Sequence, residues 1–97
     1  MITRIVKMSF LPDKVEEFMG IFNSSKDLIA GFEGCEYLEL VRDKDNKNIF
    51  FTISRWKEQT NLEKYRSSEL FQQTWSKTKV LFNNKPQAWS TTSLFKS

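Results

Sequence analysis

The stretch FFTISRWKEQTNLEKYRSSELF, residues 50–71, decides the fold of this chain. Its first part is rich in Phe, Ile and Thr and is typical of a strand. Successive side chains of a strand point to opposite faces, so four residues share one face: Phe50, Thr52, Ser54 and Trp56. Residues 58–68 then predict a short helix, and Ser68 opens a longer one. One stripe of that helix carries four residues: Phe71, Trp75, Thr78 and Phe82.

Three further strands and one helix surround this stretch. Residues 2–10 alternate as a strand does, and one face holds five residues: Ile2, Arg4, Val6, Met8 and Phe10. An amphipathic helix of about 18 residues begins at Pro12 and ends before Gly31. The segment GCEYLELVRD predicts a strand that closes near Asp43, ahead of a hairpin loop. The last segment, QAWSTTSLF (residues 87–95), predicts a fourth strand after Pro86.

The resulting order is β-α-β-β-α-α-β, which predicts an α+β fold of the ferredoxin-like kind over residues 1–97 as a single domain. Its four-stranded antiparallel sheet carries the helices on one face and leaves the other face bare. The fourth strand is apolar on both sides, with Trp89 and Phe95 on one and Ala88 and Leu94 on the other. We therefore expect a homodimer in which two sheets pack face to face.

Composition excludes several classes of protein. The chain of 97 residues has no His, which removes Ser-His-Asp and Cys-His catalysis and the usual metal and haem ligand. The carboxylates show no metal-ligand spacing, so we expect no metal. A net charge of +3 with dispersed Lys and Arg argues against nucleic-acid binding. The lone Cys35 and the lack of a long apolar segment predict a cytoplasmic protein without a membrane span.

Four strings together resemble the antibiotic biosynthesis monooxygenase (ABM) family of dimeric α+β barrels. They are MITRIVKMSFLPDKVEEFMGIF (1–22), FEGCEYLELVRD (32–43), the opening stretch (50–71) and PQAWS (86–90). The resemblance covers nearly the whole chain and is most specific around Trp56. It implies a dimeric α+β barrel, and the family's branches imply different activities.

The haem-degrading branch of the family does not fit these residues. Where the resemblance would place that branch's Trp, iron-ligating His and strand-one Asn, this chain has Tyr65, Trp75 and Val6. With no His in the chain, we expect no haem and no other cofactor.

The cofactor-independent branch fits better and implies a monooxygenase acting on a hydrophobic aromatic or quinol-like small molecule. The resemblance to this branch includes Trp56, and Thr52 replaces the branch's strand-three Asn. It implies a cavity beneath the helices, with these substrate-binding residues: Arg4, Val6, Thr52, Phe71 and Trp75. We expect Trp56 and Tyr65 to be the catalytic residues, from the chemistry that such a pocket requires. In this pocket Arg4 would stabilise a phenolate, Tyr65 and the Trp56 ring N–H would bond a ligand oxygen, and the other aromatic rings would stack.

Structural interpretations of the same residues remain open. Trp56 is equally an interior residue, and the stripe that contains Trp75 is most simply the buried face of an amphipathic helix. Arg4 is equally a partner of Glu39 or another acid across the sheet. The alternative function is a non-catalytic dimer that binds a small metabolite or has a structural or stress role. The enzyme and the non-catalytic dimer are distinguished by three polar residues: Arg4, Thr52 and Tyr65. An enzyme needs polar groups that have no hydrogen-bond partner within the fold.

Overall fold

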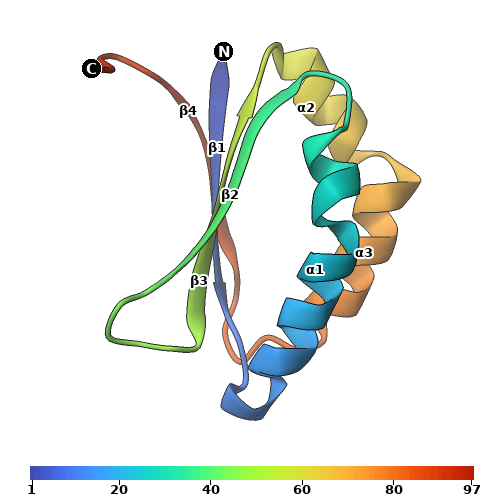
Figure 1. Ribbon diagram of the computed structural model, residues 1–97, viewed down its shortest axis with the longest axis vertical. Coiled ribbons are helices and arrows are strands. Elements are labelled where there is room, and N and C mark those ends of the chain that lie inside the picture. The colour runs from blue at the N-terminus through green and yellow to red at the C-terminus, as the bar shows by residue number, and fades with distance from the viewer.

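The computed structural model describes residues 1–97 and confirms the order β-α-β-β-α-α-β. The elements are β1 (Ile2–Ser9), a short 3-10 turn η1 (Pro12–Lys14), α1 (Val15–Ala30), β2 (Cys35–Arg42), β3 (Ile49–Trp56), α2 (Gln59–Arg66), α3 (Glu69–Lys79) and β4 (Gln87–Thr92). All neighbouring strands are antiparallel, in the order β2-β3-β1-β4. The three helices cover one face of the sheet, and nothing in the chain covers the other (Figure 1).

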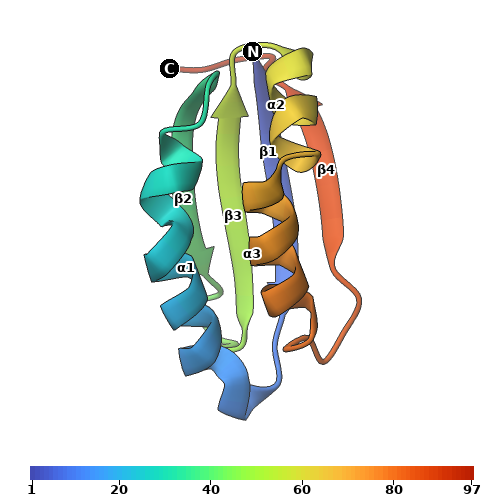
Figure 2. The ribbon, with the colours of Figure 1, turned by 90° about the vertical axis from the view of Figure 1, so that its right-hand side faces the viewer.

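The helical pair starts where its sequence provides caps. The Asn61 side chain accepts a hydrogen bond from the Glu58 backbone N–H at 3.1 Å, ahead of α2. The Ser68 hydroxyl accepts the Phe71 N–H at 3.1 Å and so begins α3. Figure 2 shows α2 and α3 following one another along the sheet, beside α1. None of the helices has the length and apolar composition needed to cross a bilayer.

Two predicted boundaries are wrong. The fourth strand ends at Thr92 rather than at residue 95, because Thr92 pairs with Ile2 and β1 has no residues left to continue the ladder. Leu94 and Phe95 therefore lie outside the sheet, 97% and 87% exposed. The long helix ends at Lys79, and Phe82 leaves it to form a bridge with Phe10 beyond the end of β1.

The dense core lies at one end of the space between sheet and helices. It is a cluster of five buried side chains: Met8, Phe10, Phe18, Phe50 and Leu81. The Phe10 ring stacks on Phe18, with ring centroids 4.2 Å apart. Met8 and Phe18 of this core also line the cavity described below, which extends from there toward Trp56 and Leu62, both buried.

Gly34 is the one residue that requires a left-handed backbone, with φ of 86°, and a Cβ there would overlap the Asn61 side chain. Gly34→Ala is therefore expected to lower the free energy of unfolding by about 2 kcal/mol, measured by urea denaturation. The matched control is Gly20→Ala within α1, where a Cβ meets nothing within 4 Å. The free energy of unfolding of Gly20→Ala should rise by roughly 0.5–1 kcal/mol, because alanine is more favourable than glycine in a helix interior. Equal losses in both variants would contradict the assignment of strain to Gly34.

Candidate functional site

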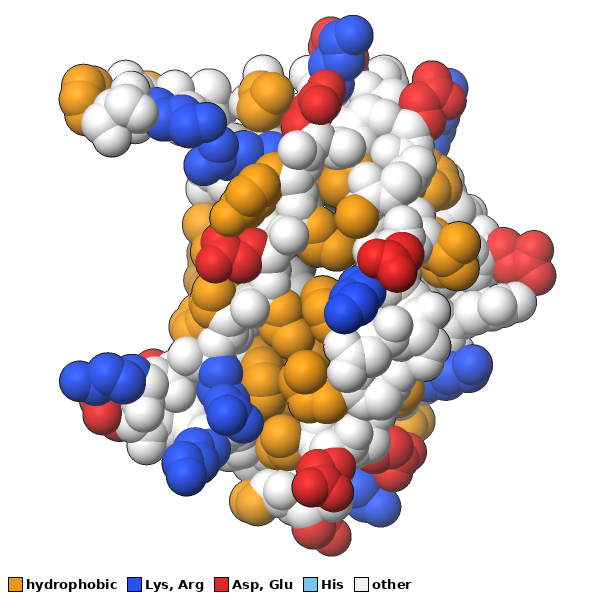
Figure 3. All heavy atoms as spheres, viewed as in Figure 1, with side chains coloured by type: hydrophobic (Ala, Val, Ile, Leu, Met, Phe, Trp, Pro, Cys, Tyr) orange, Lys and Arg blue, Asp and Glu red, His pale blue; other side chains and the backbone are white.

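A cavity of about 270 Å³ lies between the sheet and the helices. In Figure 3, hydrophobic side chains gather in the hollow between the two layers. All seven residues predicted from the sequence line this cavity: Arg4, Val6, Thr52, Trp56, Tyr65, Phe71 and Trp75. They come from β1, β3, α2 and α3, so folding brings together residues up to 71 positions apart, from Arg4 to Trp75.

The floor of the cavity follows from strand register. Arg4 of β1 lies opposite Ser54 of β3, and Val6 lies opposite Thr52. On the other side of β1, Val6 lies opposite Ala88 of β4, which also lines the cavity. Because side chains alternate along each strand, these residues all face the helices. The floor thus changes from polar at Arg4 to apolar at Met8.

One wall of the cavity is a row of aromatic rings in contact, which runs from Trp56 on β3 to Trp75 on α3. Trp56 and Tyr65 are stacked with ring centroids 5.0 Å apart, and Tyr65 meets Phe71 edge to face at 5.3 Å. Phe71 and Trp75 are then stacked at 5.8 Å with an angle of 11° between their planes. Such a wall offers flat apolar faces to a planar ligand.

Trp56 is completely buried, and its ring N–H donates to the Ser54 hydroxyl at 3.0 Å. This N–H already has a partner, which departs from the expectation that it bonds a ligand oxygen. The ring instead contributes a rigid wall and a stacking surface for Tyr65.

Tyr65 presents a phenol whose hydroxyl forms no hydrogen bond with another group of the chain. Burial, and to a smaller extent the nearby Cys35 thiol, raise the pKa of Tyr65 to about 12. The phenol therefore stays protonated at neutral pH and is available as a donor. The Thr52 hydroxyl, across the cavity on β3, is likewise without a partner in the fold.

Arg4 is half-buried and donates to the Ser90 hydroxyl of β4 at 3.0 Å. It does not pair with Glu39, which accepts a hydrogen bond from Tyr37. Burial, and then the positive charge of Arg66, lower the pKa of Arg4. One of the three discriminating residues is thus partly paired within the fold, and the other two are not.

Several lining residues were not predicted from the sequence. Arg66 and Leu62 of α2 line the cavity, as do Phe18 and Phe22 of α1. Leu62, Tyr65 and Arg66 have the i, i+3, i+4 spacing of one helix face, a signal that would have identified Arg66. No three His, Cys, Asp or Glu side chains lie together in an arrangement that could hold a metal ion.

Comparisons with solved structures show the fold. An antibiotic biosynthesis monooxygenase matches with a TM-score of 0.92 and 13% identity, over 97% of this chain and 99% of that one. A conserved protein from Methanosarcina mazei Go1 matches with a TM-score of 0.88 and 22% identity, over 94% of this chain and 91% of that one. SnoaB, a cofactor-independent oxygenase from Streptomyces nogalater solved as a mutant, matches with a TM-score of 0.86 and 16% identity, over 98% of this chain and 94% of that one.

A search of curated proteins found no match. The model of the family described as antibiotic biosynthesis monooxygenase matches residues 1–76. This match covers β1 through most of α3, and with them every predicted site residue. The chain therefore belongs to the antibiotic biosynthesis monooxygenase family.

Proposed function

We propose that this protein is a cofactor-independent monooxygenase that acts on a hydrophobic aromatic or quinol-like small molecule. The observation that carries the proposal is the pair of unpartnered hydroxyls, Tyr65 and Thr52, inside an otherwise aromatic and apolar cavity. Polar groups without a structural partner in such a pocket are typical of a ligand site. The likeness to SnoaB, named as a cofactor-independent oxygenase, supports the same activity.

The proposed reaction uses the substrate as its own reductant. In an anthrone-like phenol, deprotonation gives an electron-rich anion, which transfers an electron to O2 and then combines with it as a carbon-bound peroxide. Loss of water from the peroxide leaves a carbonyl. The ring carbon thus exchanges two hydrogens for one oxygen, and the second oxygen leaves as water with those hydrogens. The protein has to bind the anion in a fixed orientation and exclude water from it.

The cavity residues suit these tasks. Arg4 brings a positive charge that favours an ionised ligand. The Tyr65 hydroxyl donates to the oxygen that bears the negative charge, and Thr52 contributes a second hydroxyl from the floor. Phe71 and Trp75 are stacked on each other in the wall, where a ligand ring can lie against them.

Oxygen uptake by the purified, metal-stripped protein tests the proposal. The substrates are a small panel of hydroquinones and anthrone-like phenols, and heat-denatured protein is the control for autoxidation. We expect uptake that scales with the concentration of folded protein. One carbonyl product should form per O2 consumed, with one oxygen from labelled O2.

The alternative function is a non-catalytic dimer that binds a small metabolite or has a structural role. The bonds from Trp56 to Ser54 and from Arg4 to Ser90 favour it, since both engage cavity groups within the fold. Ligand binding without oxygen uptake above the denatured control would establish this alternative.

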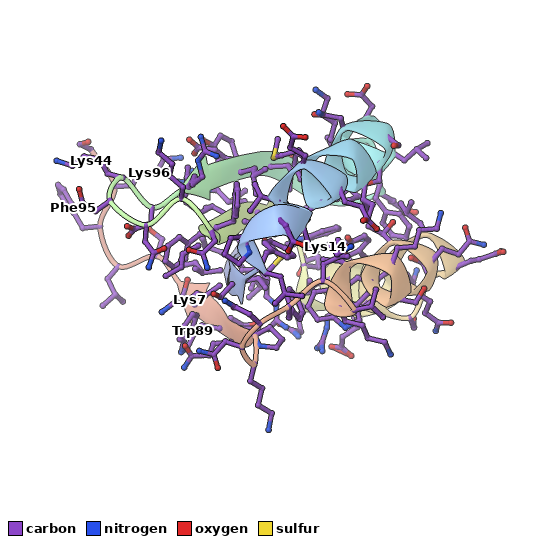
Figure 4. The ribbon with its side chains drawn as sticks, turned by 90° about the horizontal axis from the view of Figure 1, so that it is seen from below. Lys7, Lys14, Lys44, Trp89, Phe95 and Lys96 are labelled. Carbon is purple, nitrogen blue, oxygen red and sulfur yellow. The ribbon has the colours of Figure 1, made fainter.

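We also propose a homodimer formed through the uncovered sheet face. Across its centre lie five apolar side chains, none of them buried: Ile5, Val41, Phe51, Ile53 and Trp89. Figure 4 shows Trp89 and the tail residue Phe95 on the side away from the helices.

Ile5→Glu tests the dimer, because Ile5 lies on the central strand of the uncovered face and pairs with Ile53 and Trp89. Wild-type protein is expected to show twice the chain mass of 11.5 kDa by light scattering, and the variant the mass of one chain. The control is Val80→Glu, which adds the same charge after α3, where the side chain is 69% exposed. A monomeric wild type, or a dimeric Ile5→Glu, would contradict the proposed interface.

A further inference from the structure

Two arginines line the cavity, and no acid does. Arg4 enters from β1 and Arg66 from the last turn of α2. The remaining lining residues are apolar or uncharged, and none of them is Asp or Glu. The cavity therefore carries two positive charges and no negative one.

Neither guanidinium is neutralised elsewhere in the chain. The protein contains a single ion pair, between Lys14 and Glu17 at the start of α1, so Arg4 and Arg66 form none. Arg4 donates one N–H to the neutral Ser90 hydroxyl, and the side chain of Arg66 donates none. Most N–H groups of both side chains are thus available to a ligand.

The two charges act on each other. The proximity of Arg66 adds to burial in lowering the pKa of Arg4, so each cation is less favourable because the other is present. A bound anion would relieve this repulsion and replace the water that burial has removed from Arg4.

The charges also lie at one end of the cavity. Arg4 pairs in register with Ser54, at the end where Tyr65 and Arg66 stand, whereas Met8 pairs with Phe50 at the apolar end beside Phe18. A ligand that matches this arrangement has an anionic head and an aromatic body. The volume of about 270 Å³ is near the lower limit of small-molecule pockets, which suits two or three fused rings.

We propose that the ligand of this cavity is an aromatic carboxylate, whose permanently ionised carboxylate lies between Arg4 and Arg66 while its rings lie against Phe71 and Trp75. This rests on the proposed function only in using the same cavity, and it adds a charged group separate from the reacting phenol. A planar guanidinium matches a carboxylate with two parallel hydrogen bonds.

Calorimetric titration with 2-naphthoate and its neutral amide, 2-naphthamide, tests the inference, because neither probe carries a phenol or reacts with O2. We expect 2-naphthoate to bind about tenfold more tightly than the amide. Arg66→Gln and Arg4→Gln should each remove most of that preference while binding of the amide changes little. Lys64→Gln is the matched control, since it removes a positive charge from α2 outside the cavity, and it should keep the preference.

Each other outcome overturns the inference. Equal affinities in the wild type would show that no anion is recognised, and the proposed oxygenase would stand or fall separately on oxygen uptake with neutral phenols. A preference that survives both arginine substitutions, or is lost equally in Lys64→Gln, would place the anion elsewhere. Failure of both probes to bind would exclude the cavity as a site for aromatic carboxylates.

Discussion

Trp56→Ala is expected to lower the free energy of unfolding by about 3–5 kcal/mol, because Trp56 is fully buried and its removal leaves a large void. The loss also leaves the Ser54 hydroxyl without its donor and the Tyr65 ring without its stacking partner. A domain of this size loses roughly 4–8 °C of Tm per kcal/mol, so Tm should fall by at least about 12 °C in a thermal melt.

The control for this variant is Leu28→Ala on α1, where the side chain is 63% exposed and the expected change is below about 0.5 kcal/mol. A Trp56→Ala protein as stable as the control would mean that the ring is held only loosely and serves the ligand alone. In Trp56→Ala a loss of stability and a loss of ligand binding would both lower the rate of oxygen uptake. The milder Trp56→Phe is therefore the variant for the oxygen-uptake assay.

Tyr65→Phe is expected to lower kcat for oxygen uptake by about a hundredfold, the effect of removing one hydrogen-bond donor from a developing negative charge. The change deletes only the hydroxyl, and the ring keeps its stacking on Trp56 and its edge contact with Phe71. Since the pKa of Tyr65 is about 12, the wild-type rate should rise as the substrate ionises, without a fall from loss of the Tyr65 proton until pH approaches that value.

The other tyrosine of the chain provides the control. Tyr37 lies on the uncovered face of the sheet, 42% exposed, and Tyr37→Phe should keep the wild-type rate. Equal Tm values for the wild type and both variants would exclude a folding defect. An undiminished rate of oxygen uptake in Tyr65→Phe would show that the Tyr65 hydroxyl takes no part in the reaction.

The alternation of side chains was enough to predict which residues share a strand face, because strand periodicity is strict and does not depend on distant contacts. That the face of Arg4, Val6 and Met8 meets the helices was implied by the family resemblance, and these residues line the cavity. Element ends were predicted less well. Phe82 continues the spacing of the helix stripe, yet its pairing with Phe10 across the end of the sheet takes it out of the helix, and no local pattern reveals that pairing.

The candidate site shows the same limit. The resemblance to a known family located seven lining residues, but hydrogen bonding between side chains depends on exact register and rotamer. Ser54 and Trp56 share one strand face, and the sequence did not predict that one would bond the other. The spacing of Arg66 from Leu62 and Tyr65 indicates that the three share one helix face, but only the fold shows that Arg66 lies at the cavity together with Arg4.

The central position of β1 has a consequence for how the chain folds. This strand precedes its neighbours in the chain and pairs with β3 and with β4, and the hydrogen bond that Thr3 accepts from Thr91 spans 88 residues. Pairings of such long range close large loops and slow the rate-limiting step of folding. The sheet cannot be completed until the last strand has left the ribosome. A chain truncated before β4 would expose one whole edge of β1, which is a template for aggregation.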